Sequence, residues 1–71
     1  MNAQHGAEYG GWFIQSETES IAGGWCAVVE VWRSDDPNRR GKTVLYTPLF
    51  DTAGEAFAAG VNAGEQWINA H

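Results

Sequence analysis

The hydrophobic pattern of this 71-residue chain changes its period at Thr52, and this change limits the fold more than any other feature. Before Thr52, three runs are rich in β-branched and aromatic residues, as strands are. After it, small and apolar residues recur at helical spacing: Ala53, Ala56, Phe57, Gly60, Val61, Gly64, Trp67 and Ile68. The sequence therefore predicts strands followed by one helix over residues 53–69.

The expected strands cover residues 12–18, 25–33 and 42–47. Turn residues separate them: Gly10-Gly11, Gly23-Gly24 and the polar loop 34–41. Pro48 suits the end of the third strand, because proline cannot donate to a central ladder. The predicted fold class is α+β, a three-stranded antiparallel sheet packed on one C-terminal helix in two layers, β-β-β-α.

The beginning of the chain and the beginning of the helix carry different local signals. Residues 1–8 are small and polar without periodicity, so we expect a flexible N-terminal arm, followed by a single domain over residues 9–71. Thr52 and Glu55 have the spacing of a capping box. The small residues of the helical stripe would let the helix approach the sheet closely, or would serve a close contact between helices of two chains. We favour the first, because a small α+β domain must cover its sheet before anything else.

The charge and cysteine content argue against several functions. The chain has 9 Asp+Glu against 4 Lys+Arg, a formal charge of −5 that repels phosphate and anionic lipid. Its N-terminus has neither the cationic start nor the apolar run of a signal peptide or a membrane span. Cys26 is the single cysteine, and His5 and His71 lie at opposite ends, which gives no metal-ligand spacing. We therefore expect a cytoplasmic protein with no catalytic residues, metal or cofactor.

Two segments carry a family resemblance: Trp25-Cys26-Ala27 and Phe50-Asp51-Thr52-Ala53-Gly54-Glu55-Ala56. Over about residues 25–60 the chain resembles the plant AP2 DNA-binding domain and the arm-binding domain of phage-type integrases. The resemblance implies a three-stranded antiparallel sheet with a C-terminal helix. In that family the sheet carries Arg and Trp into the DNA groove, whereas alignment on Trp25 puts Glu30 at a family Arg and Val28 at a family Glu. The likeness therefore favours the architecture, in a bacterial-type protein without the DNA-binding residues.

A three-stranded sheet with one helix leaves one face uncovered, and here that face is expected to be apolar. Glu30 indicates the outward face of its strand, and the same face carries the candidate interface residues Phe13, Val28 and Trp32. An exposed apolar patch on a small protein marks an interface. The alternative is that the N-terminal arm or the 18–24 loop covers this face.

Three cations, Arg39, Arg40 and Lys42, form a second candidate contact, for an anion or an acidic partner. Asp35 and Asp36 in the same loop favour instead a solvated hairpin end. The function we expect is that of a small, non-enzymatic interaction or regulatory module that binds a protein partner through its apolar sheet face and forms a homodimer through that face or through a sheet edge. The alternative is a nucleic-acid-binding protein of AP2 or integrase-arm type, using Trp12, Trp32 and the Arg39-Arg40 loop.

Overall fold

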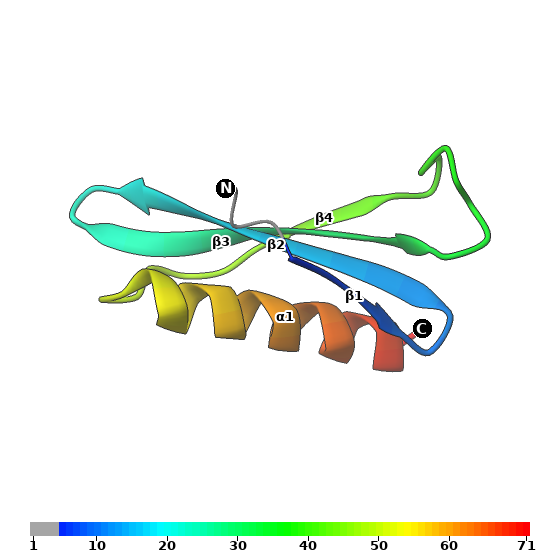
Figure 1. Ribbon diagram of the computed structural model, residues 1–71. Helices are drawn as coiled ribbons and strands as arrows, with labels where there is room; N and C mark the ends of the chain where they lie inside the picture. The colour runs from blue at the N-terminus through cyan, green and yellow to red at the C-terminus, as the bar shows by residue number, and fades with distance from the viewer. Residues whose placement is uncertain (1–4) are drawn as a thin grey trace.

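A computed structural model describes residues 5–71. The elements are β1 (His5–Tyr9), β2 (Trp12–Ile21), β3 (Gly24–Arg33), β4 (Thr43–Tyr46) and α1 (Ala53–Asn69). The strands form one antiparallel sheet in the order β1-β2-β3-β4, and α1 lies across one of its faces (Figure 1). The predicted α+β class, antiparallel sheet and C-terminal helix are confirmed. The predicted number of strands is wrong, since β1 adds a fourth.

The additional strand β1 falls where the sequence predicts a flexible arm over residues 1–8. Residues 1–4 of that segment lie outside the described residues, and the remainder pairs with β2. Gly10 and Gly11 have φ values of 58° and 86°, the left-handed conformation of a two-residue hairpin turn, with Tyr9 opposite Trp12. The sequence of β1, HGAEY, contains no β-branched residue. Its strand conformation therefore depends on this turn and on pairing with β2 rather than on propensity.

A second two-residue hairpin turn joins β2 to β3. Ala22 and Gly23 have φ values of 50° and 81°, and Ile21 pairs with Gly24 across the turn. As a result β2 continues past the predicted end at Thr18, through residues expected to form a loop. Gly24 lies close to the segment before the helix, since a Cβ atom there would be 3.3 Å from the Leu49 Cβ and from the Phe50 carbonyl oxygen. This close approach accompanies the bridge between Trp25 and Phe50, which brings the residues before the helix alongside β3.

The helix begins and ends where the sequence predicts. The Thr52 hydroxyl accepts a hydrogen bond from the Glu55 backbone N–H at 3.1 Å and lies 3.2 Å from the Glu55 carboxylate. The Thr52 half of the expected capping box is confirmed, and it satisfies a backbone donor that the first turn leaves without an intrahelical partner. The Glu55 carboxylate accepts from the Thr52 hydroxyl, whereas a complete capping box has it accept from the Thr52 backbone N–H.

Small residues on α1 allow it to lie very close to the sheet. The buried residues of the helix are Ala56, Gly60, Gly64 and Ile68. A Cβ atom on Gly60 would lie 2.8 Å from the Ala27 Cβ and 3.0 Å from the Val29 Cγ2. One on Gly64 would lie 2.8 Å from the Ile14 Cγ2. The preferred explanation of these glycines, close contact with the chain's own sheet, is therefore confirmed.

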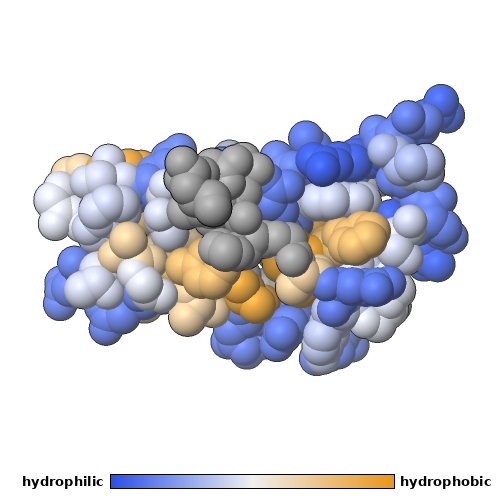
Figure 2. Space-filling view, viewed as in Figure 1, coloured by the Kyte–Doolittle hydropathy of each residue, from blue (hydrophilic) through white to orange (hydrophobic). Residues whose placement is uncertain are grey.

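The same contact explains a buried hydroxyl in the core. Ser16 on β2 has no exposed surface, and its hydroxyl donates to the Phe57 carbonyl of α1 at 3.4 Å. A Cβ on Gly60 would occupy the space of the Ser16 Oγ. Around this point lie the apolar core residues Ile14, Ala27, Val29, Val31 and Ile68. Space-filling colours show the hydrophobic residues gathered between the sheet and the helix, with hydrophilic residues outside them (Figure 2).

We predict that Gly60→Ala lowers the free energy of unfolding by about 1–3 kcal/mol, because overpacking against Ala27 and Val29 outweighs the gain in helix propensity. Urea denaturation followed by circular dichroism measures the change. Gly54→Ala is the matched control, since nothing lies within 4 Å of a Cβ at that position. Equal stability of the Gly60 variant and the wild type would contradict the close packing described here.

Candidate functional site

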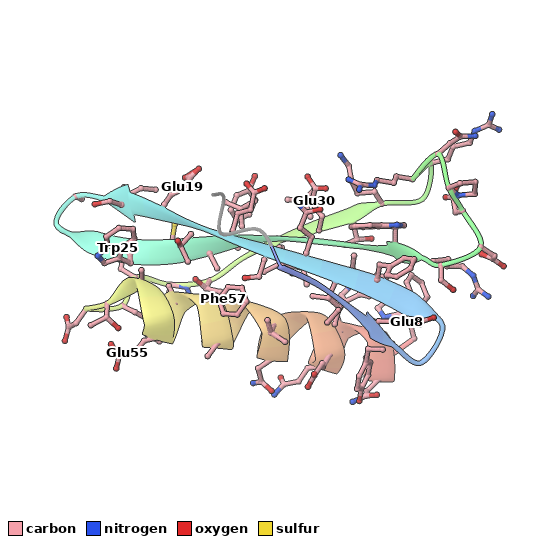
Figure 3. All side chains as sticks on the ribbon, viewed as in Figure 1. Glu8, Glu19, Trp25, Glu30, Glu55 and Phe57 are labelled. Atoms are coloured by element: carbon pink, nitrogen blue, oxygen red, sulfur yellow. The ribbon has the colours of Figure 1, made fainter. Side chains whose placement is uncertain are left out.

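The face of the sheet opposite α1 is the principal candidate surface, and we call it the open face. The side chains at alternate positions of the four strands, matched through the ladder, belong to it: Glu8, Phe13, Gln15, Glu17, Glu19, Ile21, Cys26, Val28, Glu30, Trp32, Val44 and Tyr46. Figure 3 shows Glu19 and Glu30 projecting away from the helix. The predicted division of β3 is confirmed, with Ala27 and Val29 toward the helix and Glu30 on the opposite face.

The predicted apolar patch is partly covered on this face. Trp32 is only 8% exposed, although it lies on the open face, and the expectation that it is exposed is wrong. The guanidinium of Arg39 lies 4.0 Å from the centre of the Trp32 ring, and the Phe13 ring packs beside it at 5.8 Å. Phe13 and Val28 are half-buried. Among the described residues, the cover over Trp32 therefore comes from the β3–β4 loop and not from the 18–24 segment.

Glu30 holds this loop in place. Arg39 and Lys42 lie 3.6 Å and 3.7 Å from its two carboxylate oxygens. The loop is also closed by Asp36, whose carbonyl accepts from the Arg39 N–H and whose carboxylate accepts from the Gly41 N–H, both at 3.0 Å. Arg39 has a φ of 55°, a conformation that costs energy for a residue with a Cβ atom, so these contacts fix a strained position.

The predicted cationic cluster is therefore not an open basic patch. All three of its members are exposed, but Arg39 and Lys42 are paired with Glu30. Arg33, at the end of β3, pairs with Asp35 at 3.3 Å. Glu30 on β3 thus binds two of the three cations of the predicted cluster.

Negative charge predominates on the open face. Its carboxylates are Glu8, Glu17, Glu19 and Glu30, and two cations, Arg39 and Lys42, neighbour the last of these. Glu17 accepts a hydrogen bond from the Gln15 amide at 3.1 Å, which helps to fix its position on the sheet. Both of these cations contact Glu30 of β3, and Glu17 and Glu19 on β2 and Glu8 on β1 add three further carboxylates.

Exposed apolar side chains lie on β4, a part of the open face that the sequence did not indicate. Val44 is 40% exposed and Tyr46 is 73% exposed. The ladder places Val44 opposite Glu30 and Tyr46 opposite Val28. The available signal was the lack of polar alternation in the third predicted strand, where both faces carry apolar residues. Pairing with β3 determines that Val44 and Tyr46, and not Thr43 and Leu45, lie on the open face.

The residues proposed for nucleic-acid binding are not brought together. Trp32 lies on the open face. Trp12 packs on the helix side, where the centre of its ring lies 5.3 Å from the centre of the Trp67 ring in an edge-to-face arrangement. Arg33 lies over the Trp12 ring at 5.4 Å, and His71 stacks on Trp67 at 3.9 Å. These four side chains close one end of the sheet–helix interface, on the opposite side from the Arg39 loop.

Other site types have little support within residues 5–71. Cys26 is a buried free thiol on β3. In this part of the chain, no three His, Cys, Asp or Glu residues are grouped so as to bind a metal ion. The one helix described there lacks the length and apolar character to cross a membrane.

Comparisons with known protein families, with curated proteins and with solved structures find no match for this chain. The resemblance to the AP2 and integrase arm-binding domains therefore stays a prediction.

We predict that Arg39→Ala lowers the free energy of unfolding by about 0.5–1 kcal/mol, the contribution of an exposed cation–π contact. The substitution also increases acrylamide quenching of tryptophan fluorescence, because Trp32 loses its cover. Arg40→Ala, at the neighbouring exposed position, is the control and leaves both quantities unchanged. If the two variants behave alike, Arg39 does not protect Trp32.

Proposed function

We propose that this protein is a non-enzymatic protein-binding module that binds a basic partner through its open face. One observation carries the proposal: the face that α1 leaves uncovered combines an excess of carboxylates with exposed apolar side chains on β4. A surface of this kind offers apolar contact area together with charge complementarity to lysine and arginine.

Tyr46 is the proposed anchor of the interface. It is the most exposed large hydrophobic residue in the described part of the chain, and Val28 and Val44 lie beside it on the sheet. Tyrosine contributes a large contact area with few rotatable bonds, and it is enriched among residues that dominate binding energy. A partner that covers Tyr46 and reaches across β3 meets Glu17 and Glu19 on β2.

The same charges bear on the expectation of a homodimer. If two open faces stacked on each other, each set of four carboxylates would face another set of the same sign. Like charges brought together across an interface oppose association. We therefore assign the open face to a partner of opposite charge, and self-association to a different part of the sheet.

Nucleic acid is the less favoured partner for the same physical reason. Phosphate groups are repelled by Glu8, Glu17 and Glu19, and two loop cations are already paired with Glu30. Trp12 and Trp32, the proposed stacking residues, lie on opposite faces of the sheet.

We predict that a short synthetic peptide of lysine and leucine shifts the NMR signals of Tyr46, Glu17 and Glu19. The double variant Glu17→Gln/Glu19→Gln is expected to weaken this binding about three- to tenfold, because it removes two interfacial charges and retains the side-chain shapes. Binding should also weaken as the salt concentration rises.

The matched control is Asp51→Asn/Glu65→Gln, which removes the same charge from the residue before the helix N-cap and from the C-terminal part of α1. We expect this variant to bind the peptide as the wild type does. Equal weakening in both double variants would indicate non-specific attraction to net charge. Tight binding of mixed-sequence duplex DNA at low salt, with a steep salt dependence, would favour the nucleic-acid alternative instead.

A further inference from the structure

Strand β4 forms one edge of the sheet among the described strands, and its outer side carries backbone hydrogen-bonding groups. Thr47 N–H donates to the Ala27 carbonyl at 3.0 Å, next to the ladder pair of Val28 and Tyr46. Antiparallel ladders alternate between hydrogen-bonded and non-hydrogen-bonded pairs. Hence Thr43 and Leu45 direct their N–H and C=O groups toward β3, and Val44 and Tyr46 direct theirs away from it.

Strand β4 is short, but it lacks the charged side chains and prolines that also protect sheet edges from pairing with another chain. Its sequence, Thr43-Val44-Leu45-Tyr46, contains no charge and no proline. The opposite edge, β1, does contain a charged residue, Glu8. Both β4 residues with outward backbone groups also have exposed apolar side chains. Backbone donors, acceptors and apolar surface thus coincide at one short edge.

We propose that two copies of the chain pair through β4 in antiparallel register, with Leu45 on the two-fold axis, to form one continuous eight-stranded sheet. In this register Val44 of each copy lies opposite Tyr46 of the other. Each such pair exchanges two backbone hydrogen bonds, and its side chains are neighbours on the open face. The edge is self-complementary, which is what a two-fold interface requires. This proposal does not depend on the function proposed above.

The charge distribution favours this pairing of two β4 strands, which we call the β4 joint, over stacking of the open faces. A two-fold axis perpendicular to the sheet keeps both helices on one side and both open faces on the other, so the carboxylates of the two copies do not face each other. Glu30, opposite Val44, is the carboxylate closest to the joint along the ladder. It is also the one paired with Arg39 and Lys42. Glu17 and Glu19 lie farther away, on β2.

Sedimentation equilibrium of the full chain tests the proposal with a charge exchange. Val44→Lys/Tyr46→Lys places like charges opposite each other in both cross-strand pairs, and the dimer dissociation constant should rise about tenfold or more. Val44→Lys/Tyr46→Glu places the introduced lysine of one copy opposite the introduced glutamate of the other. This second variant should recover most of the lost affinity, because only the antiparallel register proposed here creates both attractive pairs.

Ile21→Lys is the control for added charge, since the Ile21 side chain is 45% exposed and lies at the β2–β3 hairpin, away from β4. We expect its dissociation constant to match the wild type. Near-ultraviolet circular dichroism establishes that each variant keeps its fold. If a β4 variant unfolds, the sedimentation test is replaced by isotope-filtered NMR on a wild-type sample that mixes labelled and unlabelled chains. In that experiment we expect intermolecular contacts between Val44 of one copy and Tyr46 of the other.

Three results would overturn the β4 joint. They are a wild-type chain that stays monomeric at high micromolar concentration, a lysine double variant that dimerises as tightly as wild type, and a wild-type dimer whose intermolecular NMR contacts arise from Phe13 and Val28 instead. The peptide titration of the open face is read separately, so failure of the joint and failure of partner binding give different results.

Discussion

The contact between α1 and the centre of the sheet determines how the remaining surfaces of the molecule are used. Gly60 and Gly64 let the helix lie against Ile14, Ala27 and Val29, so the interior is thin and is filled mostly by small side chains. Large aromatic rings do not fit at this centre. They lie around it, with Trp12 and Trp67 at one end of the helix and Trp32 on the other face of the sheet.

A single helix cannot cover both faces of a four-stranded sheet, so the open face is stabilised by different means. Arg39 lies over Trp32, and Glu30 holds Arg39 and Lys42. This arrangement protects an indole ring with a charged side chain and keeps the surface polar. The loop cations Arg39 and Lys42 are thus used within the protein, because the acidic residue on β3 attracts them.

Local patterns in the sequence were sufficient for the helix and its cap. Both signals, the helical stripe that includes Gly60 and the cap at Thr52, depend only on residues that are close in the sequence. Together they gave the correct bounds of the helix. Strand β1 could not be found in this way, because Tyr9 is the one residue of HGAEY that favours a strand and the pairing with β2 depends on the Gly10-Gly11 turn. The cover over Trp32 was also not predictable, since it depends on a left-handed Arg39 and an ion pair across the loop.

The exposed apolar surface was predicted on the correct face but on the wrong strand, and the reason connects the two proposed interfaces. Phe13 and Trp32 pack against each other under Arg39, and Val44 and Tyr46 on the edge strand are exposed instead. Two further exposed apolar residues, Ile21 and Leu49, lie outside this strand. The exposed apolar area on the edge strand borders the outward backbone of β4 on one side and the carboxylates of β2 on the other. Pairing of two copies along β4 would place two acidic surfaces in one plane. A partner with two basic segments would then gain affinity from binding both, without any new contact within either copy.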